Sequence, residues 1–509
     1  MTGQIIDIIA ASARSNGGRR ACIDLQSGEV LSYTELDRRI DACAAILSRS
    51  VAREPATRIA MLSKNAPLML VVNFACIRLG WIFAPLNWRL SPPELAGLIE
   101  DSEPALLIAQ PGFAGVGSDL AAQAGIEMLD TDALSRSIEA EEGPFGYARG
   151  TDPDATSTLL YTSGTSGKPK GVMLSEARGF YSLANFVISY RVTSDSVFLC
   201  DMPMFHIAGL CSASRTVLMM GGTVAISEGF DETLTLRRLG DPELGVTHYF
   251  CVVQMAQRLR AHPEFPATDL SRLVALCTGG APNPRAHIEQ WLADGITMID
   301  GFGMSETGST MAMPIHDLDL IRRKAGSVGV PLLSVEARIV DGDEREVTGD
   351  MAGELWIRGP NVTRGYWNKP QETAAAFAPG GWLRTGDIAR RDADGFYYLV
   401  DRKKDMFISG GENVYPAEVE AILRTDTRLA DVAVVGVPDA RWGEVGCAYV
   451  VAAPGQALDA EELIAAARGM MAHFKAPRHV VILEALPRNA AGKVLKNELR
   501  ARFAASEPA

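Results

Sequence analysis

Short apolar runs alternate with helical stretches from the N-terminus to residue 300 of this chain. The run at 58–64 is strand-like, 67–80 has the composition of a helix, and 105–110 is strand-like again. Such alternation is typical of layered α/β sheets with mostly parallel strands. The sequence therefore predicts the α/β class, with a large N-terminal domain built in this way.

The pattern changes after residue 325. Short apolar runs at 335–340 and 353–359 alternate with turn residues, which indicates a small, antiparallel, β-barrel-like region. Charged residues and glycines then cluster at 401–415. A helix is expected after Pro416, followed by two strands, a second helix and a strand. This order predicts a small α+β domain at the C-terminal end.

Chain length and net charge limit the number of domains and the kinds of partner that this protein can have. A chain of 509 residues exceeds what one hydrophobic core usually organises. We place the domain boundary so that residues 1–402 form the N-terminal domain and 403–509 the C-terminal one. The net charge of -13 argues against nonspecific nucleic-acid binding, which requires a basic face. We therefore expect no nucleic-acid partner.

Cysteine usage and the N-terminal sequence predict a cytoplasmic protein. None of the eight cysteines forms a C-x-x-C pair, and most lie in apolar runs such as 273–277, which suits buried thiols in a reducing compartment. Residues 1–15 lack the basic and long apolar regions of a signal peptide. The apolar run 67–88 is interrupted by Asn73 and Arg78, so we expect a core helix and a strand, and no integral membrane segment. Attachment through a surface patch stays open.

The stretch 161-YTSGTSGKPKGV-172 follows the strand-like run 157–161. Its glycines permit positive φ angles and a close approach of backbone N–H groups to a ligand. Four serine and threonine hydroxyls and two lysines add donors and positive charge. A flexible surface loop is the structural alternative. The preceding strand and the two lysines favour a phosphate-binding loop.

This loop is neither of two common nucleotide motifs. A Walker A motif, G-x-x-x-x-G-K-[ST], requires glycine where the chain has Thr162, and serine or threonine where it has Pro169. No G-x-G-x-x-G fingerprint runs through the loop either. The stretch therefore indicates nucleotide binding of another kind.

Four further stretches suggest other parts of a nucleotide site. The turn 278–282 follows an apolar strand, and 300-DGFGMSETG-308 sets an aromatic residue between glycines, with an acid after it. An aromatic ring can stack on a base, and a carboxylate near phosphates can hold Mg²⁺. Asp387 follows a turn, and Lys493 lies at a glycine turn near the end of the chain. Taken singly, each has a structural alternative: a core aromatic residue, a turn cap or a solvated lysine.

Together these stretches resemble one family. Their order and spacing are similar to those of the adenylate-forming enzymes, which include acyl-CoA synthetases, firefly luciferase and the adenylation domains of peptide synthetases. The resemblance extends from residue 20 to residue 500. It rests on the loop at 161–172, 301-GFGMSET-307, 385-TGD-387, 401-DRKKDMFISGGENVYPAEVE-420 and 492-GK-493. It implies an N-terminal AMP-binding domain and a mobile C-terminal lid.

The resemblance assigns nucleotide and catalytic roles motif by motif. The loop would hold the β- and γ-phosphates of ATP, and Glu306 would bind Mg²⁺. Thr307 would lie near the α-phosphate, and Lys493 would bridge that phosphate and the substrate carboxylate. With His206, these three form the expected catalytic set. The expected ATP- and AMP-binding residues, for phosphates, adenine and ribose, are Thr162, Ser163, Gly164, Thr165, Ser166, Gly167, Lys168, Gly280, Ala281, Pro282, Asp300, Gly301, Phe302, Gly303, Asp387 and Arg402.

The resemblance also implies a coenzyme A side and an acyl side. Lys404 would be the hinge on which the small domain turns. Gly410 and Gly411 would let the thiol arm approach the backbone. His206 would lie at the mouth of the acyl pocket, with a core histidine as the structural alternative. The pocket wall is expected from Tyr249, Phe250, Cys251, Val252, Gly279 and Met304.

The chain departs from the family pattern at Phe302, where tyrosine is frequent, and at Ser305, where threonine is frequent. Neither change is expected to abolish activity. Many relatives have proline near Val252, so the backbone there is less well defined by the resemblance. No acid among residues 202–212 would pair with the ammonium group of an amino acid. The apolar wall suits a fatty or aromatic acid instead.

The leading hypothesis is an ATP-dependent acyl-CoA ligase. It would convert a fatty, aromatic or arylpropenoic acid to acyl-AMP and pyrophosphate, and then to acyl-CoA and AMP. Coenzyme A is the expected thiol, because no carrier-protein module follows the small domain. The alternatives are a stand-alone enzyme that loads a carrier protein, a non-catalytic nucleotide-binding protein, and a luciferase-like oxidation of the adenylate. The expected partners are the acid, ATP and coenzyme A, and the protein is expected to be a monomer or a homodimer.

Overall fold

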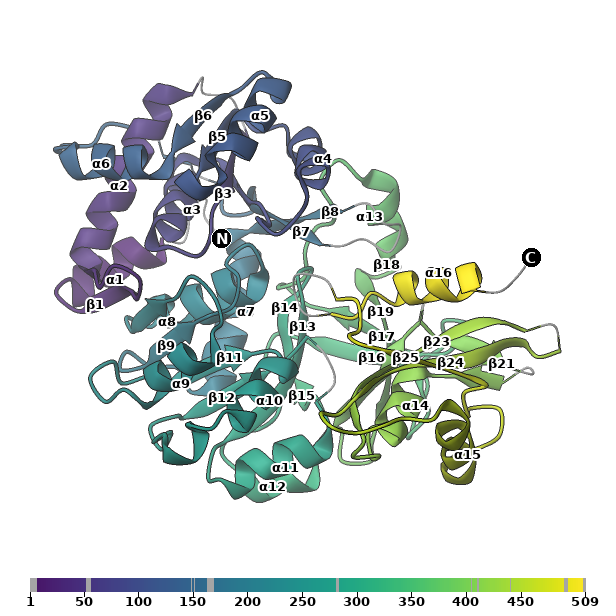
Figure 1. Ribbon diagram of the computed structural model, residues 1–509. Helices are drawn as coiled ribbons and strands as arrows, with labels where there is room; N and C mark the ends of the chain where they lie inside the picture. The colour runs from purple at the N-terminus through teal and green to yellow at the C-terminus, as the bar shows by residue number, and fades with distance from the viewer. Residues whose placement is uncertain are drawn as a thin grey trace. The chain divides into compact units, whose positions relative to one another are not determined.

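The structure is a computed structural model with two compact units (Figure 1). The first contains Met1–Glu336 and Ile357–Leu383, and the second contains Ala337–Trp356 and Arg384–Ala509. The boundary expected between residues 402 and 403 separates the N-terminal domain from the mobile C-terminal lid. It stays a prediction. The structure describes residues 7–51, 56–147, 149–150, 152–162, 169–280, 283–403, 405–409, 412–439, 441–488 and 493–506.

One sheet of the first unit carries the hairpin around the candidate phosphate loop. Within the described residues its strand order is β6-β5-β3-β4-β7-β8. Neighbours are parallel except for β7 and β8, which are antiparallel. Leu98 from α4 (Pro92–Ser102) and Leu120 from α5 (Ala114–Ala124) pack against it. The strands are β3 (Arg58–Leu62), β4 (Ile82–Pro85), β5 (Leu106–Ala109), β6 (Glu127–Asp130), β7 (Thr156–Thr162) and β8 (Lys170–Ser175).

The other large sheet of this unit has the order β15-β14-β13-β12-β11-β9-β10-β1-β2 in the described part of the chain. Its centre, from β13 to β1, is parallel, and antiparallel strands lie at both edges. These two sheets confirm the layered α/β prediction. The strands are β1 (Arg20–Asp24), β2 (Val30–Ser32), β9 (Val197–Cys200), β10 (Thr223–Ile226), β11 (His248–Cys251), β12 (Ala275–Thr278), β13 (Met298–Met304), β14 (Gly308–Ala312) and β15 (Val330–Pro331).

Helix α3 (Pro67–Leu79) lies between these two sheets and contacts β1, β4 and β7. It is hydrophobic on all sides, which is typical of a buried helix. Asn73, one of its two polar interruptions, donates to Thr158 Oγ1 over 3.1 Å. The helix expected at 67–80 is therefore present as a core element, followed by β4. The other helices of this unit are α1 (Ile8–Asn16), α2 (Tyr33–Ser50), α4 (Pro92–Ser102), α5 (Ala114–Ala124), α6 (Thr131–Ala140), α7 (Glu176–Tyr190), α8 (Thr216–Met219), α9 (Glu232–Gly240), α10 (Val253–Ala261), α11 (Arg285–Ala293), α12 (Leu318–Arg323) and α13 (Pro370–Ala376).

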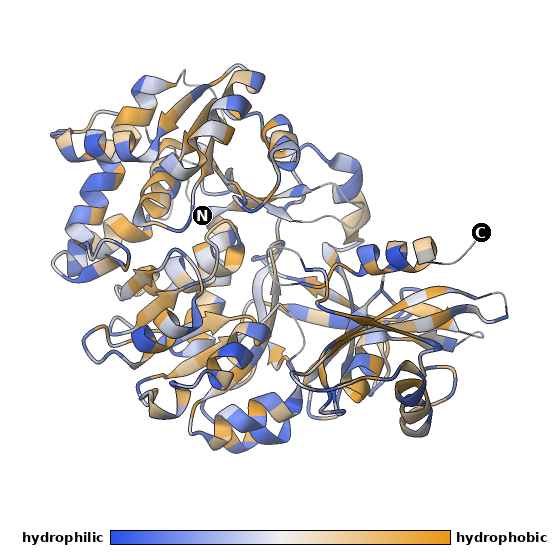
Figure 2. Ribbon diagram, in the orientation of Figure 1, coloured by the Kyte–Doolittle hydropathy of each residue, from blue (hydrophilic) through white to orange (hydrophobic). Residues whose placement is uncertain are grey.

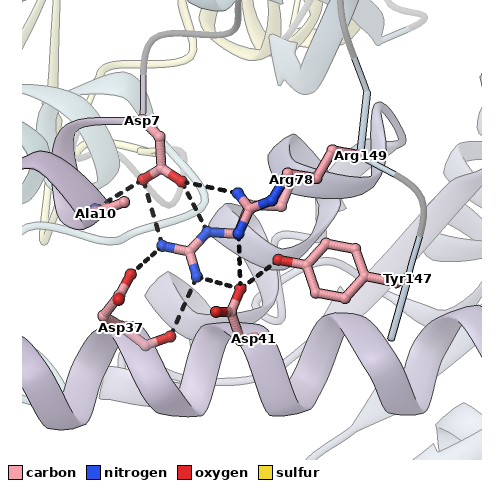
Figure 3. Close-up of polar contacts among 7 residues, drawn as sticks. All are labelled: Asp7, Ala10, Asp37, Asp41, Arg78, Tyr147 and Arg149. Carbon is pink, nitrogen blue, oxygen red and sulfur yellow. Dashed lines mark hydrogen bonds and ion pairs between the residues drawn. The ribbon is translucent and has the colours of Figure 1, made fainter. Parts of the chain in front are cut away.

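Arg78, the other interruption of α3, is the centre of a buried polar cluster (Figure 3). Its guanidinium forms ion pairs with Asp7, Asp37 and Asp41, which precede α1 or lie on α2. The Tyr147 hydroxyl also donates to Asp41. A buried charge is tolerated when it is paired and hydrogen-bonded. Arg78 therefore ties α1 and α2 to α3.

A third sheet has the order β16-β17-β19-β18, with β20 paired to β19. Its pairs β18–β19 and β19–β20 are antiparallel, as the change of pattern after residue 325 predicts. Thr385 Oγ1 donates to the Leu355 carbonyl over 2.7 Å and so links two of its strands. The strands are β16 (Glu336–Val340), β17 (Gly353–Arg358), β18 (Phe377–Ala378), β19 (Trp382–Arg391) and β20 (Tyr397–Arg402).

The rest of the second unit is a small α+β fold, as expected. Its sheet has the order β22-β21-β24-β23, and β25 pairs with β24 in parallel. One core cluster, around Phe407, Val434 and Leu463, joins this sheet to its helices. The elements are β21 (Phe407–Ser409), β22 (Glu412–Val414), α14 (Pro416–Leu423), β23 (Leu429–Asp439), β24 (Gly443–Ala452), α15 (Ala460–Met470), β25 (His479–Leu483) and α16 (Lys496–Ser506).

Hydrophobic residues are concentrated in the strands, whereas the outer helices alternate between hydrophobic and hydrophilic positions (Figure 2). This is the pattern of helices with one buried face. None of the helices within the described ranges combines the length and the hydrophobicity that a membrane-spanning segment requires.

Candidate active site

The candidate phosphate loop closes the hairpin between β7 and β8. Thr162, at the end of β7, is paired with Lys170, at the start of β8, so the ends of the loop are fixed by the sheet (Figure 1). Ser163, Gly164, Thr165, Ser166, Gly167 and Lys168 lie outside the described residues. Their phosphate-binding role stays a prediction.

Strand β13 carries the second candidate motif and pairs with β14. Two of its glycines are required by this pairing. A Cβ atom at Gly301 would lie 2.9 Å from the Met311 carbonyl oxygen, and one at Gly303 would lie 2.4 Å from that of Gly308. Phe302 between them is buried. Its expected position against the adenine base stays a prediction.

Glu306 and Thr307 follow β13 and are buried. The Glu306 carboxylate accepts a hydrogen bond from the Tyr366 hydroxyl over 2.9 Å. The Lys170 ammonium lies 5.1 Å from the centre of the Tyr366 ring. Burial and the nearby carboxylate raise the pKa of Tyr366, so the phenol stays protonated and can donate this bond. The candidate metal ligand is thus joined through one tyrosine to the end of the phosphate loop.

The donor set fits Mg²⁺ that arrives with ATP. The described residues contain no group of three or more His, Cys, Asp or Glu side chains that could hold a metal by themselves. Mg²⁺ is usually held by one or two carboxylates together with substrate phosphates and water. Glu306 supplies one such hard oxygen ligand close to the hairpin that leads into the loop. Its role as the Mg²⁺ ligand stays a prediction.

Asp300, in the expected adenine site, is buried in a hydrogen-bonded cluster. Thr278 Oγ1 donates to its Oδ1 over 3.0 Å, and Asn283 Nδ2 donates to Thr278 Oγ1 over 3.0 Å. Burial raises the pKa of Asp300 to about 7. Gly280, which follows β12, has a φ of 82° that favours glycine. Ala281 and Pro282 lie outside the described residues.

The expected acyl wall divides between two faces of β11. The Phe250 ring lies beside Gly279, where a Cβ atom would be 3.2 Å from Phe250 Cζ. Side chains alternate along a strand, so Tyr249 and Cys251 point to the opposite face. Both are fully buried, and Tyr249 donates to Asp201 over 3.1 Å. This packing argues against Tyr249 and Cys251 as pocket walls, and their assignment stays a prediction.

Two other expected wall residues lie at the ends of elements. Val252 is half-buried and precedes α10, and its φ of -83° and ψ of 157° are extended. Met304 is half-buried at the end of β13, and its backbone N–H donates to Thr307 Oγ1 over 3.4 Å. Both positions leave part of the side chain accessible, as a ligand wall requires.

His206 is half-buried, and its surroundings favour the neutral imidazole. Burial and the nearby Arg89 lower the pKa of His206 to about 4. Its Nε2 atom is buried and has no hydrogen-bond partner among the described residues. Directly after it, Ala208–Arg215 forms a π-helix, a rare conformation that is frequent at functional sites. A neutral imidazole with one open nitrogen is suited to a polar contact with a bound acid.

The second unit carries the remaining candidates. Asp387 is buried on β19 and lies opposite Arg402 on β20 in the strand register. Its backbone N–H donates to Thr385 Oγ1 over 3.1 Å. Their expected ribose contacts stay predictions. Lys404, Gly410 and Gly411 lie outside the described residues.

Lys493 is exposed, and described residues near it in the chain form contacts within the same unit. Leu495 N–H donates to the Pro487 carbonyl over 2.8 Å, and Arg488 forms an isolated bridge with Val494. Lys496, three residues further on, forms a 2.8 Å ion pair with Glu420. These contacts hold residues 494–496, directly after Lys493, against Pro487, Arg488 and Glu420.

Sequence reasoning missed Tyr366 and Asn361. Both belong to 361-NVTRGYW-367, and Asn361 Nδ2 donates to the Thr307 carbonyl over 2.8 Å. The signal in the sequence is Gly365 followed by two aromatic residues, Tyr366 and Trp367, in a segment that has neither a helical nor a strand pattern. Spacing along the chain does not indicate that this segment meets residues 306 and 307.

Comparison with known proteins decides the family. Residues 9–367 match the family model described as AMP-binding enzyme, and residues 418–493 match that of the AMP-binding enzyme C-terminal domain. The chain belongs to the AMP-binding enzyme family. This assignment confirms the resemblance to the adenylate-forming enzymes.

Two similar proteins place this AMP-binding enzyme in the acyl-CoA synthetase branch, and a solved structure has a similar fold. A feruloyl-CoA synthase from Amycolatopsis sp is 38% identical over 476 residues, which cover 94% of each chain. An indoleacetate–CoA ligase from Aromatoleum aromaticum is 37% identical and covers 92% of each chain. The crystal structure of ATP-bound MatB from Rhodopseudomonas palustris is 29% identical, with a TM-score of 0.90 over 99% of both chains.

Proposed function

We propose that this enzyme is an ATP-dependent ligase that joins an aromatic carboxylic acid to coenzyme A. The acid would first react with ATP to give acyl-AMP and pyrophosphate. The thiol of coenzyme A would then displace AMP and form the thioester. Membership of the AMP-binding family and the names of the two relatives support this reaction. The observation that carries the choice of acid is the contact between the Phe250 ring and Gly279.

That contact would give the pocket an aromatic wall next to a position without a side chain. The missing Cβ atom at Gly279 leaves room for the Phe250 ring. A flat substrate ring would pack against the accessible part of that ring. Aromatic rings prefer offset or edge-to-face neighbours, which add about 0.5–1.5 kcal/mol beyond area burial. An aryl or arylpropenoic acid would therefore gain more from this wall than an aliphatic acid of equal length.

In the first step two anions must meet, so repulsion is the main difficulty. Lys493 would lie between the acid carboxylate and the α-phosphate, and the N–H and hydroxyl groups of residues 162–168 would hold the other phosphates. Fixed donors of this kind stabilise charge without reorganisation during the reaction. When bound with ATP, Mg²⁺ would neutralise further charge on the phosphates. Holding both reactants in line contributes up to about 7–11 kcal/mol in the best cases.

In the second step the small domain would rotate about Lys404. The two residues that flank Lys404 in the chain each form an ion pair. Lys403 pairs with Glu354 over 3.1 Å, and Asp405 pairs with Arg500 over 3.2 Å. With its neighbours held in this way, a change of backbone torsion would be concentrated at residue 404, as in other hinges. Rotation would remove Lys493 and bring the Gly410 and Gly411 segment to the thiol.

The experiment that tests this proposal measures AMP release by the purified protein with Mg-ATP. Cinnamic, benzoic, arylacetic and fatty acids are compared, each with and without coenzyme A. We expect AMP and an acyl-CoA product only when coenzyme A is present, and the highest kcat/KM with aromatic acids. Acyl-AMP without a thioester would instead favour loading of a carrier protein. Higher kcat/KM values for fatty acids would contradict the aromatic assignment.

A further inference from the structure

Tyr366 lies between the turn after β13 and strand β8. Its hydroxyl donates to Glu306 Oε1 over 2.9 Å. Its ring faces the Lys170 ammonium at 5.1 Å. Its backbone forms an isolated bridge with Val172 on β8. One side chain thus contacts the candidate metal ligand and also the strand that leaves the phosphate loop.

The backbone around Tyr366 is held independently of its hydroxyl. We call residues 361–367 the brace. On one side, Thr363 N–H donates to the Glu306 carbonyl over 2.7 Å. On the other side, Trp367 N–H donates to the Gly171 carbonyl over 2.8 Å. The brace therefore ties the turn after β13 to β8, and loss of the phenolic oxygen leaves these bonds intact.

The hydroxyl bond acts on the orientation of the carboxylate. A carboxylate that binds a metal is usually hydrogen-bonded in turn, and this second bond fixes which oxygen faces the metal. Tyr366 engages Oε1, so it would fix the orientation of the Glu306 carboxylate. A phenol suits this task because it donates to the carboxylate and adds no charge of its own.

We infer that Tyr366 is a positioning residue that orients the Glu306 carboxylate for the Mg²⁺ of Mg-ATP, and that the brace couples this carboxylate to the phosphate loop. The inference rests on the proposed function, because it takes Glu306 as the ligand of the metal that accompanies ATP. Tyr366 would act through Glu306 and not on the reacting atoms.

The test compares Tyr366→Phe with Tyr147→Phe. Tyr147 also donates to a carboxylate, that of Asp41, but belongs to the Arg78 cluster (Figure 3). Mn²⁺ replaces Mg²⁺ as the probe, and its binding to each protein with ATP is measured by electron paramagnetic resonance. The Mg²⁺ concentration for half-maximal AMP release and kcat at saturating Mg²⁺ are measured as well.

We expect Tyr366→Phe to weaken Mn²⁺ binding and to raise the half-saturating Mg²⁺ concentration by about tenfold, the lower end of the range for residues that support metal ligands. At saturating Mg²⁺ its kcat should stay within about threefold of the wild-type value, since the ligand itself remains. Tyr147→Phe should leave the metal dependence unchanged. In the Glu306→Gln background, Tyr366→Phe should have little further effect, as expected of two residues that act through one contact.

Unchanged Mn²⁺ binding in a folded Tyr366→Phe protein would overturn the inference. If that variant does not fold, Asn361→Ala loosens the brace at Thr307 and is expected to weaken Mn²⁺ binding by about threefold, a smaller change because Glu306 keeps its tyrosine contact. Unchanged Mn²⁺ binding in Asn361→Ala would also overturn the inference. Mn²⁺ binding needs ATP alone, so this result is obtained even if no acid in the panel is a substrate.

Discussion

The Phe250 ring lies directly against Gly279, so closely that a Cβ atom added there would be 3.2 Å from Phe250 Cζ and 3.4 Å from the Gly301 carbonyl oxygen. The first distance is shorter than ordinary van der Waals contact. One neighbour is a ring that can turn, and the other is backbone of β13 that is fixed by its pairing with β14. Any side chain at residue 279 must therefore displace the ring or occupy space in the expected acyl pocket.

This relationship predicts a change of acid selectivity in Gly279→Ala. We expect kcat/KM for a ring-substituted cinnamic acid to fall about 10–200-fold, the usual range for one methyl or methylene group in a tight pocket, and kcat/KM for a short aliphatic acid to change much less. Steady-state kinetics with both acids gives the ratio. The double variant Gly279→Ala with Phe250→Leu should recover part of the loss. An equal loss with both acids would mean that Gly279 does not line the pocket.

Lys493→Ala is expected to separate the two half-reactions. Loss of a charge that stabilises the first step should slow acyl-AMP formation by about 10²–10³-fold, as for other preorganised donors. Thioester formation from supplied acyl-AMP should change by less than about threefold, because the proposed rotation would have removed Lys493 from the site by that step. Single-turnover assays of each step provide the comparison within one protein. Equal losses in both steps would contradict the assignment of Lys493.

His206 predicts part of the pH dependence of stability. Its pKa is lowered to about 4 from the ordinary 6.5, so between these values the unfolded chain binds more protons. Stability should therefore fall as the pH drops from 6.5 to 4. Glutamine does not titrate, so the Tm of His206→Gln should fall less over this pH range than the wild-type Tm. The difference in the free energy of unfolding should be at most about 1.4 kcal/mol per pH unit. Parallel Tm curves of both proteins between pH 6.5 and 4.5 would show that His206 is not held neutral.

The Arg78 cluster predicts a large loss of stability in Arg78→Met. Three carboxylates would lose their common partner, and removal of one side of a buried ion pair usually costs about 3–5 kcal/mol. The matched control is Arg19→Ala, because Arg19 pairs with Asp195 on the surface, where an ion pair contributes about 0–1 kcal/mol. Urea denaturation of both variants measures the difference. Equal costs would mean that the cluster is not held by Arg78.

Much of the fold follows from the sequence because its signals are local. The alternation of strands and helices, the apolar helix at 67–79, and the change to short antiparallel strands each depend on neighbouring residues. The strand before the candidate phosphate loop could be located for the same reason, and the structure confirms it as β7, which pairs with β8. The phosphate-binding role of the loop itself stays a prediction.

The remaining features depend on contacts between distant parts of the chain. Tyr366 meets Glu306 from 60 positions away. Gly301 and Gly303 are needed by the close pairing with β14, which the motif itself does not reveal. Tyr249 and Phe250 are adjacent in sequence but face opposite sides of β11, and composition alone does not indicate which of them faces the pocket. Strand register and packing between distant segments determine these three features, and neither can be read from neighbouring residues.

The most direct test of the central claim follows oxygen from the acid. An aromatic acid labelled with ¹⁸O in its carboxylate is converted by the enzyme with Mg-ATP and coenzyme A, and the products are analysed by mass spectrometry. Attack of the carboxylate on the α-phosphorus predicts that one ¹⁸O atom appears in AMP and none in pyrophosphate. Formation of ADP with labelled phosphate, or unlabelled AMP beside the acyl-CoA product, would contradict adenylation of the acid.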